Sequence, residues 1–118
     1  MLKHKPKKVD KRWGYELWLA NNEEHNYCGK ILHINEGCRS SMHFHLKKHE
    51  TFYVTQGKLY LDLIDTISGD KYAREICEGE TFEIPAGQPH QLFAYNHDVE
   101  FIEISTFHDD ADSKRVWR

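Results

Sequence analysis

The chain has 118 residues, of which 39% are hydrophobic and 30% charged, and its formal net charge is −3 with histidine neutral. A chain of this length suits one domain whose core buries most of its apolar surface. The acidic balance argues against a general nucleic-acid-binding protein, and no apolar run approaches the ~20 residues of a membrane-spanning helix. We therefore expect neither nucleic acid nor membrane among its partners.

Residues 1–12 form a basic arm that contains Lys3, Lys5, Lys7, Lys8, Lys11 and Arg12. Such a segment is typical of a solvated, partly disordered tail, although a tether to anions or to a partner has the same composition. No apolar segment follows this basic start, so we expect no secretory signal.

The three cysteines, Cys28, Cys38 and Cys77, form no CxxC pair. An odd number of cysteines in a short chain indicates reduced thiols rather than a disulfide framework. We therefore expect a cytoplasmic protein.

Short segments of alternating apolar and polar residues, separated by Gly, Pro and Asn turns, predict strands along most of the chain. They are expected over residues 13–19, 27–34, 50–56, 58–65, 72–77, 81–84, 90–95 and 99–106. No helical period persists over a dozen residues, so the pattern predicts an all-β sandwich or barrel. The polar tail that follows is expected to pack back as an arm or a short helix.

Two histidines, His43 and His45, are separated by one residue in the most distinctive stretch of the chain. On a strand they point to the same face ~7 Å apart, so their ring nitrogens can converge on one ion at ~2.1 Å. His90 is the candidate for a further ligand. A histidine on an apolar face is more often a hydrogen-bonded core residue, and the spacing is what favours a metal site here.

Glu50 shares its predicted strand face with Phe52 and Val54. A carboxylate buried on this apolar face needs a partner, which a metal ion would supply. His49 has the opposite parity and is left outside the ligand set, with a contact to a ligand as its alternative role. The lysines at 47–48 are expected in a solvated hairpin turn.

Two motifs in the chain resemble those of the cupin family. The first is Gly37-x5-His43-x-His45-x4-Glu50-x6-Gly57, and the second is Gly79-x5-Pro85-x-Gly87-x2-His90. The resemblance implies a double-stranded β-helix, or jelly-roll barrel, over residues 13–108, with the basic arm 1–12 before it and a C-terminal tail, 109–118, after it.

The same resemblance implies a metal centre with His43, His45, Glu50 and His90 as ligands. This ligand set would leave two of six coordination positions open for water or substrate. It suits one divalent transition metal ion, Mn, Fe, Co, Ni or Zn, and does not choose among them.

A narrower similarity links the chain to the cupin domain of type II mannose-6-phosphate isomerases. The segments that resemble this group are 12–16, 29–34, 50–54, 84–90 and 101–106. The chain departs from the group between His45 and Glu50, where it has four residues instead of three and no arginine among them.

These residues lead to a hypothesis of a metal-dependent enzyme acting on a small oxygenated substrate such as a sugar or sugar phosphate. The metal would bind adjacent carbonyl and hydroxyl oxygens, and a base would move a proton between carbons. Glu103 and Lys30 are the candidates for base and substrate binding, and Phe52 and Tyr53 for further substrate contacts. A solvent-facing Glu103 on the last strand is the alternative reading of that residue.

Two other functions remain open at this stage. A metal dioxygenase or a lyase acting on a small organic acid would use the same ligands, and a non-catalytic module that binds a sugar or another small molecule would need no base. A homodimer is also expected, because aromatic residues on outward-looking strand faces leave sheet surface for a second copy; these are Tyr53, Tyr60, Phe93 and Tyr95.

Overall fold

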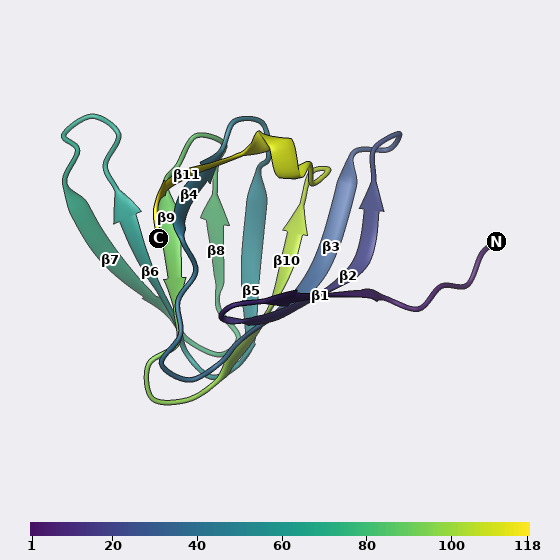
Figure 1. The fold of residues 1–118 in the computed structure, drawn as a ribbon, viewed down its shortest axis with the longest axis horizontal. Coiled ribbons are helices and arrows are strands. Elements are labelled where there is room, and N and C mark those ends of the chain that lie inside the picture. The colour runs from purple at the N-terminus through teal and green to yellow at the C-terminus, as the bar shows by residue number, and fades with distance from the viewer.

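The computed structural model describes all of residues 1–118 and consists almost entirely of antiparallel strands (Figure 1). The strands are β1 (Lys7–Lys11), β2 (Gly14–Asn22), β3 (Tyr27–Ile34), β4 (Met42–His45), β5 (Glu50–Gln56), β6 (Leu59–Ile64), β7 (Lys71–Ile76), β8 (Thr81–Ile84), β9 (His90–Phe93), β10 (Val99–Ser105) and β11 (Ser113–Trp117). A single 3₁₀ turn, η1 (Asp110–Asp112), precedes β11. The all-β prediction is therefore confirmed.

The strands form two sheets that pack face to face. One sheet has the order β1-β2-β3-β10-β5-β8 and the other β11-β4-β9-β6-β7. One continuous apolar core includes Phe52 and Phe101 from the first sheet and Leu61 and Leu63 from the second. The period-2 alternation of Leu59, Leu61 and Leu63 places these leucines on the inner face of β6, as the sequence predicts. This two-sheet jelly roll has the barrel architecture that the resemblance implies.

The two ends of the chain are more ordered than the sequence suggests. Within the basic arm, residues 7–11 form β1 and pair with β2. Lys7 and Lys8 remain exposed, as expected, and lie over the rings of Trp18 and Tyr15, at 5.0 and 4.8 Å from the centroids. At the other end, β11 pairs with β4 and extends the second sheet.

No helix in the structure is long and apolar enough to cross a membrane. All three cysteines, Cys28, Cys38 and Cys77, are free thiols. The cytoplasmic location inferred from their number stays a prediction.

Candidate metal centre

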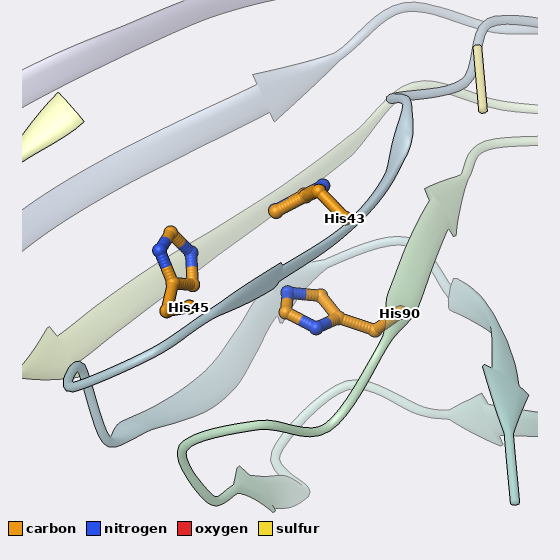
Figure 2. Close-up of side chains that lie close together, drawn as sticks. All are labelled: His43, His45 and His90. Atoms are coloured by element: carbon orange, nitrogen blue, oxygen red, sulfur yellow. The ribbon is translucent and has the colours of Figure 1, made fainter. Parts of the chain in front are cut away.

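Three histidines converge between the two sheets (Figure 2). His43 and His45 lie on β4, and His90, at the start of β9, is the direct cross-strand partner of His43. The ring centroids of His43 and His90 are 4.5 Å apart, and each of the three rings offers a nitrogen within 4.8 Å of the other two. Side chains opposite one another on antiparallel strands lie on the same face, so the pairing of β4 with β9 brings the rings together.

Glu50 reaches the same cluster from β5, in the opposite sheet. Its Oε2 atom lies 3.3 Å from Nε2 of His90 and 3.6 Å from Nε2 of His45. This oxygen is buried and has no hydrogen-bond partner, and Nδ1 of His45 is in the same situation. Buried polar atoms rarely remain unpaired in a native protein, so this cluster is suited to binding a further group.

The imidazole rings are held in the form that binds metal. Burial, and next the neighbouring His90, lower the pKa of His43 to about 3, and burial followed by the charge of Lys48 lowers the pKa of His45 to about 2. Nδ1 of His43 donates to the Ser41 carbonyl at 2.9 Å, which leaves its Nε2 lone pair free. Neutral imidazoles whose other nitrogen is fixed by a backbone carbonyl are typical metal ligands.

A backbone carbonyl also fixes the ring of His90. Its Nδ1 donates to the Gln88 carbonyl at 2.8 Å, so its Nε2 faces Glu50. Three imidazole nitrogens and one unpaired carboxylate oxygen form a donor set that suits a divalent transition metal. The residues present therefore fit a metal ion, although the geometry does not choose which one.

A network of buried charges adjoins the histidines. Nζ of Lys48 lies 2.5 Å from Oε2 of Glu103 and 3.9 Å from Oε1 of Glu50. Lys30 lies 3.4 Å from Oε1 of Glu16 on the neighbouring strand β2. Burial raises the pKa of Glu103, but the charges of Lys48 and Lys30 outweigh it and hold this pKa well below its usual range. Glu103 is therefore a carboxylate at neutral pH.

Lys48 corrects the sequence-based interpretation of its segment. It was expected in a solvated turn with Lys47, but only 3% of its surface is exposed. The carboxylate of Asp112 accepts from the backbone N–H groups of Lys47 and Lys48, and this clamp turns Lys48 inward. Residues 46–49 lie outside any strand, so no alternation pattern could have indicated the direction of this side chain.

The other predicted site residues divide between the interior and the surface. Lys30, Phe52 and Glu103 are buried and line the same cavity as the histidines, so the solvent-facing alternative for Glu103 is wrong. The prediction that Tyr53 contacts substrate is corrected by the structure. Tyr53 lies on the outer face of β5 with 38% of its surface exposed and does not reach the cavity. His49 also lies outside, 2.5 Å from Glu83, as its parity predicted.

The cavity has a volume of about 290 Å³, which is enough for a small molecule. Sequence reasoning did not assign several of its lining residues to the site, and most of these come from the two ends of the chain. His108 follows the last predicted strand, and its Nδ1 lies 2.9 Å from Nζ of Lys48. The others are Lys11, Asp110, Arg115 and several serines, whereas Arg12 and Glu16 lie in the segment 12–16 that a resemblance had marked.

Comparison with known proteins places this site in context. The profile of the family described as Cupin matches residues 26–116. Germin-like protein 3-8 of Oryza sativa subsp. japonica is 30% identical over 94 residues, which are 75% of this chain and 40% of the rice protein. This chain therefore spans less than half the length of that relative.

Two solved structures share the fold at low sequence identity. Oxalate decarboxylase from Bacillus subtilis superposes with a TM-score of 0.82 at 19% identity, over 94% of this chain and 30% of that one. The capsular polysaccharide assembling protein CapF from Staphylococcus aureus superposes with a TM-score of 0.84 at 16% identity, over 98% and 33%. The family match covers well over half of the sequence, and the fold agrees with it, so this chain belongs to the cupin family.

Proposed function

We propose that this cupin is a metal-dependent enzyme acting on a small oxygenated substrate such as a sugar or sugar phosphate, in the manner of mannose-6-phosphate isomerase. The observation that carries the proposal is the buried, unpaired oxygen of Glu50 facing the rings of His45 and His90. Together with His43 these residues would hold one divalent ion, which could be Mn, Fe, Co, Ni or Zn. A bound ion would act as a Lewis acid on carbonyl and hydroxyl oxygens of the substrate.

Glu103 is the residue proposed to move the proton in such a reaction. It lines the cavity, and its Oε2 accepts from Lys48 and from the Ser105 hydroxyl at 2.9 Å. These contacts keep the carboxylate ionised, so it can accept a proton, and the lowered pKa makes it a weaker base than an ordinary glutamate. Lys30 and Phe52 line the same cavity, where the ammonium group of Lys30 can donate to substrate oxygens and the ring of Phe52 can pack against carbons.

A turnover screen tests this proposal. The protein is stripped of metal, reloaded separately with Mn, Fe, Ni or Zn, and assayed for aldose–ketose interconversion of sugar phosphates. We expect turnover with at least one metal, its loss in Glu103→Gln, and retention of metal in that variant. His49→Gln is the matched control, since His49 lies on the outer surface.

The alternatives give different results in the same screen. Oxygen uptake with Fe(II) and a small organic acid would indicate a dioxygenase, and loss of carbon dioxide or water would indicate a lyase. Calorimetric binding of a sugar without any turnover would indicate a binding module. Each of these outcomes would contradict the isomerase-like assignment.

We also propose that the chain forms a homodimer through the outer face of its larger sheet. An apolar row crosses four neighbouring strands there, because Leu17 pairs with Ile31, Ile31 with Ile102, and Ile102 with Tyr53. Ile104 lies two residues further along β10 with 62% of its surface exposed. An apolar sheet face of this kind is suited to burial against a second copy.

A further inference from the structure

Three basic side chains line the outer part of the cavity, and we call them the basic rim: Lys11, Arg12 and Arg115. All three are exposed and none forms an ion pair within 4.0 Å, although the hydrogen bond from His108 and, to a smaller extent, the charge of Lys11 lower the pKa of the Asp110 carboxylate. The lysines deeper in the cavity differ, since Lys30 is paired with Glu16 and Lys48 with Glu103. Arg12 and Arg115 in particular therefore hold positive charge that no carboxylate of the protein pairs with.

The rim is assembled from the two ends of the chain. Lys11 ends β1 and Arg12 follows it in the turn to β2, while Arg115 lies on β11, next to β4 (Figure 1). These segments line one cavity although they are more than one hundred residues apart in the sequence. The pairing of both chain ends with the barrel therefore places the basic rim at the cavity.

Arg115 is aimed at the cavity by its position in the sheet. It is the direct cross-strand partner of His43, so its side chain leaves the sheet on the same inner face as that ring. Ser113 is likewise opposite His45. Lys114, between them, is opposite Phe44 and leaves on the outer face, so β11 presents one of these two cations to the cavity and one to solvent.

The charge balance at the rim favours an anion. Asp110 is the exposed carboxylate among the lining residues, and it is already bonded to Nε2 of His108 at 2.7 Å. The rest of the chain has the opposite sign, because the formal net charge of the protein is −3. A local positive field on an acidic protein attracts small anions to one place on its surface.

We propose that the substrate carries a carboxylate or phosphate group, and that Lys11, Arg12 and Arg115 bind it while the oxygens at its other end face the histidine cluster. This inference rests on the proposed function, because it takes the histidine cluster as the site of chemistry. The cavity of about 290 Å³ requires a small molecule for this arrangement. Arginine forks bind both carboxylate and phosphate groups through paired hydrogen bonds, so both belong to the proposed class.

Three probes that share one metal-chelating group separate the rim from the metal. Acetohydroxamate, malonomonohydroxamate and phosphonoacetohydroxamate end in a methyl, a carboxylate and a phosphonate group, respectively. Their binding to the cobalt-loaded protein is measured by calorimetry, and the cobalt absorption spectrum reports chelation independently. We expect the two anionic probes to bind at least about tenfold more tightly than acetohydroxamate, the effect of one or two charge-assisted hydrogen bonds.

Substitutions in the rim should remove only this difference. Arg12→Gln and Arg115→Gln should each weaken the anionic probes by about tenfold and leave acetohydroxamate binding unchanged, which also shows that each variant is folded. Lys114→Gln is the matched control, because it removes one positive charge from the outer face of the same strand. A loss confined to the phosphonate or to the carboxylate probe would identify which of the two groups the rim recognises.

Other outcomes would overturn the inference. Equal affinity for all three probes would show that the rim does not bind the anionic group. The same conclusion would follow if Arg115→Gln weakened acetohydroxamate as much as the anionic probes. Failure of the proposed function looks different, because turnover would then be absent while the probes still separate by charge. A chain that holds no cobalt and binds none of the probes would refute both proposals.

Discussion

Nζ of Lys48 lies 2.5 Å from Oε2 of Glu103, and both side chains are almost completely buried. The lysine comes from the loop between β4 and β5 and the carboxylate from β10, so the pair ties the loop to the barrel. Lys48 also lies 3.9 Å from Glu50, which joins the candidate base to the histidine cluster in one network. The charges of Glu103 and Glu50 outweigh the effect of burial and hold the pKa of Lys48 above its usual range.

Replacing Lys48 with methionine should destabilise the metal-free protein. The substitution leaves the carboxylate of Glu103 buried without its main partner, and breaking a buried ion pair in this way typically costs about 3–5 kcal/mol. Urea-induced unfolding measures the change. The double variant Lys48→Met with Glu103→Met should recover part of the loss, since it removes both charges, and a single variant as stable as the parent would contradict the role of the pair.

Strand positions and the histidine cluster could be predicted from the sequence, because both depend on a period of two. The strands over 27–34, 50–56 and 81–84 have the predicted bounds, and His43 and His45 meet His90 as expected. The direction of Lys48 could not be predicted, since an irregular loop and a backbone clamp from Asp112 determine it.

Tyr53 and the chain termini show the same limit. Neighbouring residues of β5 point to opposite faces of the sheet. Phe52 therefore lines the cavity, whereas Tyr53, which was also expected to contact substrate, does not. The contribution of Arg115 depends on a long-range pairing of β11 with β4. Pairing between distant segments leaves no local pattern in the sequence, so this part of the cavity required the structure.

The ligand assignment predicts which histidine substitutions remove metal. His45→Ala and His90→Ala should largely abolish binding, because each removes one donor from a buried cluster of three imidazoles. His49→Ala should bind as much metal as the parent, since its ring lies outside against Glu83. Metal content after dialysis, measured by atomic absorption, checks this, and equal content in all three variants would refute the assignment.

The metal-free protein should lose stability as the pH falls from about 6.5 toward about 3. The folded-state pKa values of His43 and His45 are lowered to about 3 and about 2, whereas both rings have the ordinary histidine pKa of 6.5 in the unfolded chain. The unfolded chain therefore binds more protons within this window, and each ring contributes a slope of about 1.4 kcal/mol per pH unit. Urea unfolding at several pH values gives the slope of the unfolding free energy against pH. This slope should be smaller in His43→Gln by the contribution of one proton, and an unchanged slope would contradict the lowered pKa of His43.

The proposed dimer predicts a mass of twice 14.0 kDa by analytical ultracentrifugation. Ile104→Lys should shift the protein to the monomer, because a charge buried in an apolar interface loses its hydration. Ile67→Lys is the control, since Ile67 is 98% exposed but lies in the turn between β6 and β7, away from the larger sheet. A monomeric parent at high concentration would refute the dimer.

Two glycines of the first motif should differ in their tolerance of alanine. Gly37 and Gly57 both have a positive φ, of 75° and 83°, so alanine at either position costs about 1–2 kcal/mol of backbone strain. At Gly57 a Cβ atom would also lie 2.6 Å from the carbonyl oxygen of Asp98, whereas at Gly37 it would meet nothing within 4 Å. Gly57→Ala should therefore lower the free energy of unfolding by about 1–3 kcal/mol more than Gly37→Ala, as expected for overpacking against rigid backbone. Urea midpoints of the two variants measure the difference. Equal midpoints would show that the backbone at Asp98 can move away from the added methyl group without a loss of stability.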